Sequence, residues 1–372
     1  YTFATISVYY AWDSNDGAIF DKKFYVITSE FKVYKCIIAP PATASTVQPT
    51  QTLTAPTAES DGYTWKYMYT LTVADSEKFL TTSYLPVKTV SLGGQGTVLG
   101  AVSSSTTVIL SEINSKIHTG MTVSGTGISG TPTVLSIAGS VLTLSAAQSI
   151  SNAVILTFAY ATDGAAELAL SEGDYAQYLN QKASRDVANA AGIERIEISN
   201  GGGDYSAKPT VTITGDGTGA TVSAGNITMS GSGSTQSVAS ITLNNKGNDY
   251  TFADISFSTG SASANATIAP PTGHGTDPVS ELGGFFVGIN TQLSGTGGAG
   301  ADLTVGNDFR QISLIKNPTK LLLFLLLIFF KKVNIVLKFW SIRILDIILM
   351  TSTTSNFSIL LNNSHLYKPS ST

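Results

Sequence analysis

Charged side chains are scarce in this chain, because Asp, Glu, Lys and Arg together make up only 12% of its 372 residues. The formal net charge is −4, so the surplus of Lys and Arg that phosphate binding needs is missing, and we expect no nucleic-acid partner. Few charges and 35 glycines favour short strands joined by tight turns. The chain is therefore predicted to be mainly β.

Cysteine and histidine are almost absent. The single cysteine, Cys36, excludes an internal disulfide, and the strand pattern around it predicts a buried structural thiol. The three histidines lie far apart in the sequence and form no metal-spaced cluster: His118, His274 and His365. We expect His274, which stands between two glycines, to be a turn residue hydrogen-bonded to Asp277.

Motifs for catalysis are also missing. Residues 125–130 and 295–300 satisfy G-x-G-x-x-G, but neither precedes a convincing helix, as a dinucleotide site requires. The acidic turn at residues 13–17 does not fit a calcium loop, since its glycine comes one position too early. Paired carboxylates of a glycoside hydrolase meet only in the fold and leave no spacing signal. We predict no enzyme activity and assign no catalytic, cofactor-binding or metal-binding residue.

Residues 319–372 contain neither Gly nor Ala, although all 35 glycines precede them. Leu, Ile, Phe, Lys, Asn and Ser dominate, as they do when A/T-rich DNA is translated. We interpret this tail as a frameshift or readthrough product, and we interpret a chain that opens on Tyr1 as an internal fragment. The apolar run 321–330 is too short to span a membrane, and the run 333–350 carries three charges. We expect few contacts between the tail and the β-domains.

Four aromatic side chains alternate along one predicted strand: Tyr63, Trp65, Tyr67 and Tyr69. Side chains of a strand alternate between its faces, so these four are expected on one face. Their combined area exceeds what an edge hairpin needs, and we place the strand in the centre of a sheet.

The composition divides the chain into four segments: a β domain (1–90), an inserted small β-module (91–162), a helix with a duplicated β-unit (163–318) and the tail (319–372). In the insert, short apolar runs recur at a spacing close to ten residues, which indicates a small barrel or sandwich. The fold class is therefore a multi-domain β-sandwich or barrel.

One amphipathic helix is expected between Asp174, as its N-cap, and Gly192. Its apolar stripe should pack on the sheet that follows: Tyr175, Leu179, Ala183 and Val187. After it, residues 196–205 align with residues 241–250 at an offset of 45, and both segments end in Asp-Tyr. This repeat predicts a duplicated β-unit.

The segment Asp-Gly-Tyr-x-Trp-Lys-Tyr-Met-Tyr at residues 61–69 resembles the baseplate wedge subunit of contractile-tailed (myovirus-type) bacteriophages. Residues 307–318, Asn-Asp-Phe-Arg-Gln-Ile-Ser-Leu-Ile-Lys-Asn-Pro, resemble that family near its C-terminal region. Two matches in the expected order are more specific than one. Shorter matches link them, at residues 24–30, 33–36 and 273–278. The insert and the tail depart from the resemblance.

The resemblance implies a virion structural protein of the tail baseplate, assembled in the host cytoplasm. It implies a homodimer that contacts other baseplate wedge proteins, without cofactor, nucleic acid or membrane. The alternative is a glycan- or host-surface-binding β-module protein of a phage tail, in which the insert and the repeat tyrosines bind sugars. Exposed tyrosines would favour this alternative, and buried ones would count against it.

Overall fold

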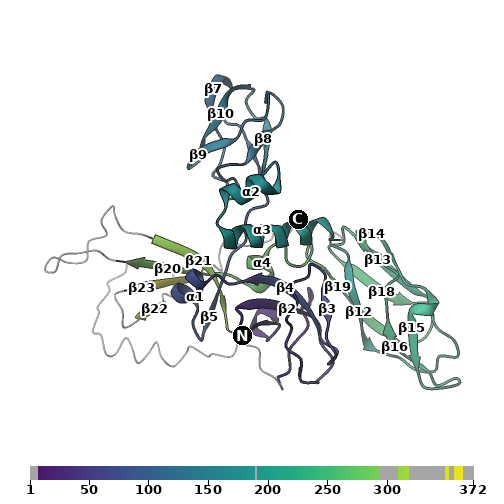
Figure 1. Ribbon diagram of the computed structural model, residues 1–372. Coiled ribbons are helices and arrows are strands. Elements are labelled where there is room, and N and C mark those ends of the chain that lie inside the picture. The colour runs from purple at the N-terminus through teal and green to yellow at the C-terminus, as the bar shows by residue number, and fades with distance from the viewer. Residues whose placement is uncertain (1–6, 189–190, 293–308, 318–347, 352–355, 363–372) are drawn as a thin grey trace, which may run out of the picture. The chain divides into compact units, whose positions relative to one another are not determined.

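The computed structural model describes residues 7–188, 191–292, 309–317, 348–351 and 356–362. The fold is mainly β, with several antiparallel sheets and few helices (Figure 1). The chain divides into two compact units. Unit 1 comprises Tyr1–Lys88 and Ser184–Thr372, and unit 2 comprises Thr89–Ala183.

The first sheet of unit 1 is antiparallel, with four strands in the order β1 (Tyr25–Ile27), β2 (Lys32–Ile38), β4 (Thr64–Thr70) and β3 (Thr57–Ala58). The aromatic strand β4 lies inside the sheet, as its composition predicted. The turn before it holds Gly62 at a φ of 85°, and the Asp61 carboxylate accepts the backbone N–H groups of Thr46, Val47 and Tyr63. These bonds explain the Asp-Gly pair, because Gly adopts positive φ without steric cost and Asp bonds nearby backbone.

A β-bulge breaks the alternation of β4. Two neighbouring residues of β2 pair with Tyr69 and Tyr67, which leaves Met68 between them as the extra residue. Tyr63 and Trp65 belong to one buried cluster, and their rings stack at 5.7 Å. Met68 and Tyr69 belong to another. The expectation of four aromatics on one face is therefore wrong for Tyr69, because the bulge turns it to a different core.

The duplicated unit forms a six-stranded sheet and a two-stranded sheet. The larger has the order β13 (Val211–Gly215), β18 (Ala253–Phe257), β19 (Ser263–Ile268), β12 (Ile193–Asn200), β16 (Ser237–Ile241) and β15 (Ile227–Ser230). The smaller pairs β14 (Thr218–Thr221) with β17 (Asn245–Asn248). Ile196 and Ile241, which are equivalent in the two copies, pair directly. The last strand of each copy pairs with the leading part of the other, so the copies interleave.

The repeated tyrosines also pack across the two copies, each against a glycine of the other copy. Tyr205 of the first copy packs on Gly260 of the second, where an added Cβ would lie 2.2 Å from the ring. Tyr250 of the second copy packs on Gly217 of the first, where an added Cβ would lie 2.4 Å from the ring. The residue before each tyrosine is an aspartate with a φ near 60°. Glycine is needed at both contacts because no side chain would fit beneath the rings.

A further sheet of unit 1 has five strands in the order β22 (Ile348–Thr351), β23 (Asn356–Asn362), β20 (Phe286–Gln292), β21 (Phe309–Lys316) and β5 (Tyr84–Val87). The expectation of few contacts for the tail is wrong for its described part, because β23 pairs with β20 along the whole length of β20. An open sheet edge accepts such a strand readily. The frameshift interpretation stays a prediction.

The run 321–330 lies outside the described residues, as does most of 333–350. Among the helices that the structure describes, none has the length and apolar character needed to cross a membrane.

The described part of unit 1 also contains short helices: α1 (Val73–Phe79), α4 (Pro278–Leu282) and the 3-10 turns η1 (Ile19–Asp21) and η2 (Ala224–Asn226). Helix α4 begins at Asp277, whose carboxylate accepts the N–H of Ser280, and ends at Gly283 in the left-handed conformation. Pro278 suits the first helical position, since that N–H has no partner in a helix. Both ends of α4 are therefore set by local sequence, and they hold the residue between them, Glu281, in place.

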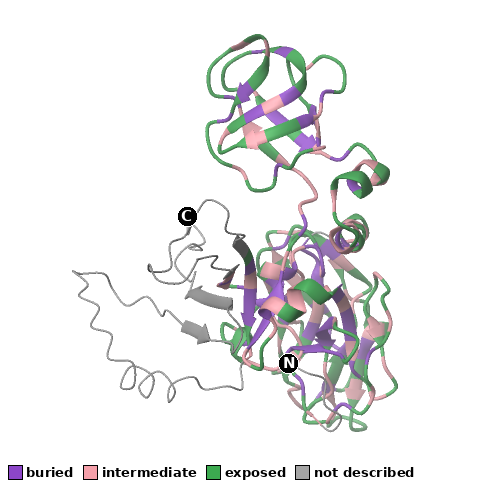
Figure 2. Ribbon diagram, turned by 60° about the vertical axis from the view of Figure 1, so that its left-hand side comes forward, coloured by how far each residue is buried: buried purple, intermediate pink, exposed green. Residues whose placement is uncertain are grey.

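Unit 2 contains two three-stranded antiparallel sheets. One has the order β7 (Val102–Ile109), β10 (Val141–Ile150) and β9 (Val134–Ala138), and the other has the order β6 (Gly94–Thr97), β11 (Ile155–Ala159) and β8 (Thr122–Ser124). Alternate residues of both sheets are buried in a single core, among them Val108, Leu142, Leu156 and Phe158 (Figure 2). Each predicted apolar run thus contributes to a strand or to its immediate flank.

The helices after these strands are α2 (Asp163–Ala169) and α3 (Glu172–Asp186). The compact unit extends to Ala183 rather than to residue 162, because Tyr178 of α3 packs in the core of unit 2. The predicted stripe of α3 is wrong, since Leu179 and Val187 are exposed. Ser171, not Asp174, caps the helix, and its hydroxyl accepts the N–H of Asp174.

Candidate functional site

Two buried lysines face each other across the centre of the first sheet. Lys35 of β2 and Lys66 of β4 are cross-strand partners and are 0% and 1% exposed. A buried ammonium group is costly unless it is paired, and like charges on opposing strands repel. The groups that contact these two ammonium groups therefore determine whether the sheet can bury them and remain stable.

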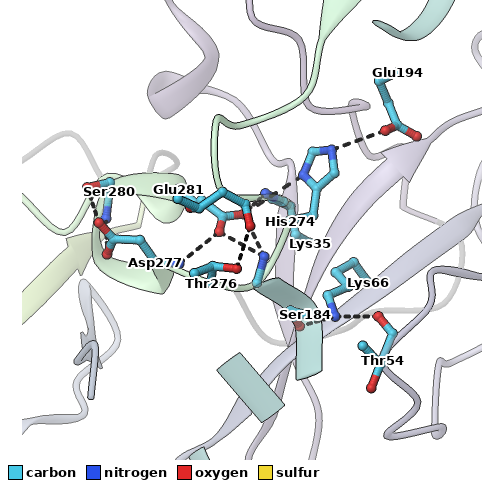
Figure 3. Close-up of polar contacts among 12 residues, drawn as sticks. Lys35, Thr54, Lys66, Ser184, Glu194, His274, Thr276, Asp277, Ser280 and Glu281 are labelled. Carbon is cyan, nitrogen blue, oxygen red and sulfur yellow. Dashed lines mark hydrogen bonds and ion pairs between the residues drawn. The ribbon is translucent and has the colours of Figure 1, made fainter. Parts of the chain in front are cut away.

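Lys35 forms a buried ion pair with Glu281 of α4 (Figure 3). Its ammonium group also lies 5.1 Å from the centre of the Trp12 ring, within range of a cation–π interaction. Burial lowers the pKa of Lys35, and the Glu281 carboxylate offsets only part of that effect. The proton between the two groups is therefore held less firmly by the lysine than it would be in water.

The loop before α4 holds the Glu281 carboxylate. The Gly275 N–H donates to both carboxylate oxygens, at 2.8 Å to Oε1 and 3.0 Å to Oε2, and the Asp277 N–H donates to Oε1 at 3.1 Å. Gly275 has a φ of 93°, and an added Cβ would lie 2.6 Å from Cε of Lys66. Glycine is required there because the loop backbone lies directly against the lysine.

His274 lies in the same loop with its ring buried between two carboxylates. Its Nε2 is 3.5 Å from Oε2 of Glu194, and its Nδ1 is 3.8 Å from Oε2 of Glu281. Trp12 packs edge-on against the ring, with centroids 5.0 Å apart. The expected hydrogen bond from His274 to Asp277 is not the contact observed, since the Asp277 carboxylate caps α4 instead.

Burial, reinforced by the charge of Lys35, lowers the pKa of His274 to about 4, although the two carboxylates oppose this. Burial also raises the pKa of Glu194, but His274 and Lys246 outweigh it and the net pKa falls to about 2. Lys246 donates to Glu194 at 2.8 Å. Near neutral pH the imidazole is therefore neutral and the Glu194 carboxylate ionised.

Lys66 has polar but uncharged hydrogen-bond partners. Its ammonium group donates to the Thr54 carbonyl at 2.5 Å and to the Ser184 hydroxyl at 2.9 Å. Burial is the main reason that the pKa of Lys66 falls from 10.5 to about 8. This lysine is therefore close to losing its charge at moderately alkaline pH.

The cluster joins separate elements of unit 1, because its side chains come from β2, β4, β12 and α4. The polar ends of these side chains point toward one another, and each of the main side chains of the cluster is buried or almost buried. An arrangement of this kind can hold elements together or carry chemistry among its own residues. It offers an external substrate little access.

Within the described residues, the turn motifs and the cysteine that could suggest ligand binding have structural roles. Residues 125–130 form a turn that leads into β9, not into a helix. In the acidic turn, Asp13 accepts hydrogen bonds from the Asn15 N–H and the Thr267 hydroxyl. Cys36 is fully buried, and burial raises the pKa of its thiol. His118 is exposed on unit 2, whereas residues 295–300 and His365 lie outside the described residues.

Among the described residues, no group of three or more His, Cys, Asp or Glu side chains is placed to hold a metal ion. The repeat tyrosines Tyr205 and Tyr250 are 3% and 5% exposed. Their hydroxyls accept backbone N–H groups, of Ala262 and Ala220 respectively. Burial of both rings counts against sugar binding through them.

Comparison with known proteins does not identify a relative: no family model, no curated protein and no solved structure matches this chain. The resemblance to baseplate wedge subunits therefore stays a prediction.

The buried cluster was not predicted from the sequence. A local signal for part of it exists, because Lys35 and Lys66 each interrupt an apolar and aromatic run that is otherwise typical of a core strand. A lysine in such a place needs a partner. The partner Glu281 is 246 residues away from Lys35, so no pattern of spacing could have named it.

Proposed function

We propose that this chain is a non-enzymatic structural component of the baseplate wedge of a contractile-tailed bacteriophage. The proposal places it in the virion, after assembly in the host cytoplasm. It acts there by packing against other wedge proteins, and it requires no cofactor.

The observation that carries the proposal is that the segments of the resemblance, which lie far apart in the sequence, pack together in unit 1. Residues 24–30, 33–36 and 61–69 contribute β1, β2 and β4, which are neighbours in one sheet. The loop 273–278 covers the two lysines of that sheet. In the segment 307–318, Ile315 belongs to the same buried cluster as Tyr69. Chance matches scattered along a chain would not be expected to meet in this way.

Mass spectrometry of purified virions tests the proposal. We expect peptides from unit 1 and from unit 2 in intact particles and in isolated baseplates, in a constant ratio to the other wedge proteins. A protein present in infected cells but absent from particles would refute the assembly role.

The proposed homodimer has its own test. Light scattering after size-exclusion chromatography should give twice the chain mass of 38.8 kDa. A monomer at all concentrations would remove the dimer from the proposal but leave the wedge role to the virion experiment.

A further inference from the structure

The Lys35–Glu281 pair has the geometry of a reacting amine and carboxyl group. The Lys35 nitrogen contacts Oε2 of Glu281, and the ammonium-bearing side chain is fully buried (Figure 3). On the other side of the carboxyl group, Oε1 accepts the N–H of Asp277 and, at the shorter of its two distances, the N–H of Gly275, which also reaches Oε2. Two backbone donors on one oxygen stabilise negative charge that develops there during attack at the carbon.

We propose that Lys35 and Glu281 join covalently through an intramolecular isopeptide bond. The ion pair first exchanges a proton and becomes a neutral amine and a carboxylic acid. The Lys35 nitrogen then attacks Cδ of Glu281, the Nζ–Cδ bond forms, and the Cδ–Oε2 bond breaks. Oε2 leaves with two protons, one from the acid and one from the nitrogen, so that one water molecule is released. No oxidant, cofactor or external reactant takes part.

His274 is placed to carry the proton. Its Nδ1 lies 3.8 Å from Oε2, the oxygen that leaves. The imidazole is neutral at neutral pH, because burial lowers its pKa to about 4. A neutral imidazole can accept a proton from the attacking nitrogen and deliver it to the leaving oxygen. Burial also lowers the pKa of Lys35, which favours the amine form that attacks.

The surroundings favour the amide over the ions. In water, solvation stabilises a separate ammonium and carboxylate, so condensation is unfavourable. In this core the two charges have lost that solvation, and a buried ion pair recovers the cost only in part. The amide carries no charge, keeps the backbone hydrogen bonds to Oε1, and releases its water to solvent. The bond would connect β2 to α4 and close a chain segment of 246 residues.

Intact-mass spectrometry of the denatured full-length protein tests the proposal. We expect the mass of the sequence less one water molecule, and after trypsin digestion a branched peptide that joins the segment around Lys35 to the segment around Glu281. Trypsin should not cleave after Lys35, because the amide removes its charge. The full sequence mass, together with a normal cleavage after Lys35, would show an ion pair only and overturn the proposal.

Three variants test whether Lys35 and Glu281 are the two residues that form the bond. Lys35→Arg keeps the positive charge but lacks the amine, and we expect its full sequence mass. Glu281→Gln reacts by releasing ammonia in place of water, so its product should have the same mass as the wild-type product. Lys66→Arg is the matched control, because Lys66 is the buried partner on the opposite strand, and it should keep the loss of one water. Loss of water in Lys35→Arg would contradict the assignment, and the wild-type mass decides the question even if a variant does not fold.

Discussion

Lys66 should make the stability of unit 1 depend on pH in the alkaline range. Its pKa falls from 10.5 to about 8 on burial, so the unfolded chain holds this proton more tightly than the folded protein. Between these two pH values the unfolded state binds more protons, and the free energy of unfolding therefore rises with pH. Below pH 8 the folded protein bears the full cost of the buried charge, and above about 10.5 that cost is gone.

The size of the effect follows from the two pKa values. A difference of about 2.5, at about 1.4 kcal/mol for each tenfold change, corresponds to about 3 kcal/mol. Lys66→Met removes this cost at every pH but leaves the Thr54 carbonyl without its donor, a loss of about 1–3 kcal/mol. We therefore expect the variant to be about as stable as the wild type, or more stable, at pH 7. At pH 10.5 it should be the less stable protein.

Urea denaturation of both proteins from pH 7 to pH 10.5 measures this difference. Comparison of the two cancels the titration of groups that they share, and Lys116→Met serves as control because Lys116 is exposed. The free-energy difference between Lys66→Met and the wild type should change by about 3 kcal/mol over this range. Parallel pH profiles would refute the reasoning, because they would mean that Lys66 is solvated in the folded protein.

Three further predictions concern other parts of the fold. His274→Gln should reduce the decrease in melting temperature between pH 6.5 and pH 5. The His274 pKa of about 4 means that the unfolded state takes up this proton at a higher pH than the folded protein, so protonation destabilises the wild type. A pH dependence equal to that of the wild type would contradict the burial of His274. Gly260→Ala should cost about 1–3 kcal/mol more than Gly233→Ala in urea denaturation, since both glycines have positive φ but only Gly260 lies against the Tyr205 ring; equal costs would count against the reciprocal packing. The fragment Thr89–Ala183 should fold alone, with a cooperative melt by circular dichroism, because it has its own core; a disordered fragment would show that unit 2 depends on the rest of the chain.

The sequence by itself determined features whose signals are local. The mainly β class was indicated by scarce charged residues, abundant glycine and short alternating apolar runs. The repeated Asp-Tyr segment indicated the duplicated β-unit from the sequence alone. These predictions succeed because strand alternation and tight turns depend on residues next to one another in the chain.

The tertiary structure decided the rest. The β-bulge at Met68 places Tyr69 in a different buried cluster from Tyr63 and Trp65, and nothing in the composition of the strand predicts such a bulge. The buried face of α3 depends on what covers it, so polar Gln181 is buried while Leu179 is exposed. Lys35, Glu281 and His274 meet only because β2 and the loop before α4 pack together. Contacts between residues hundreds of positions apart arise from packing, and packing is a property of the whole folded chain.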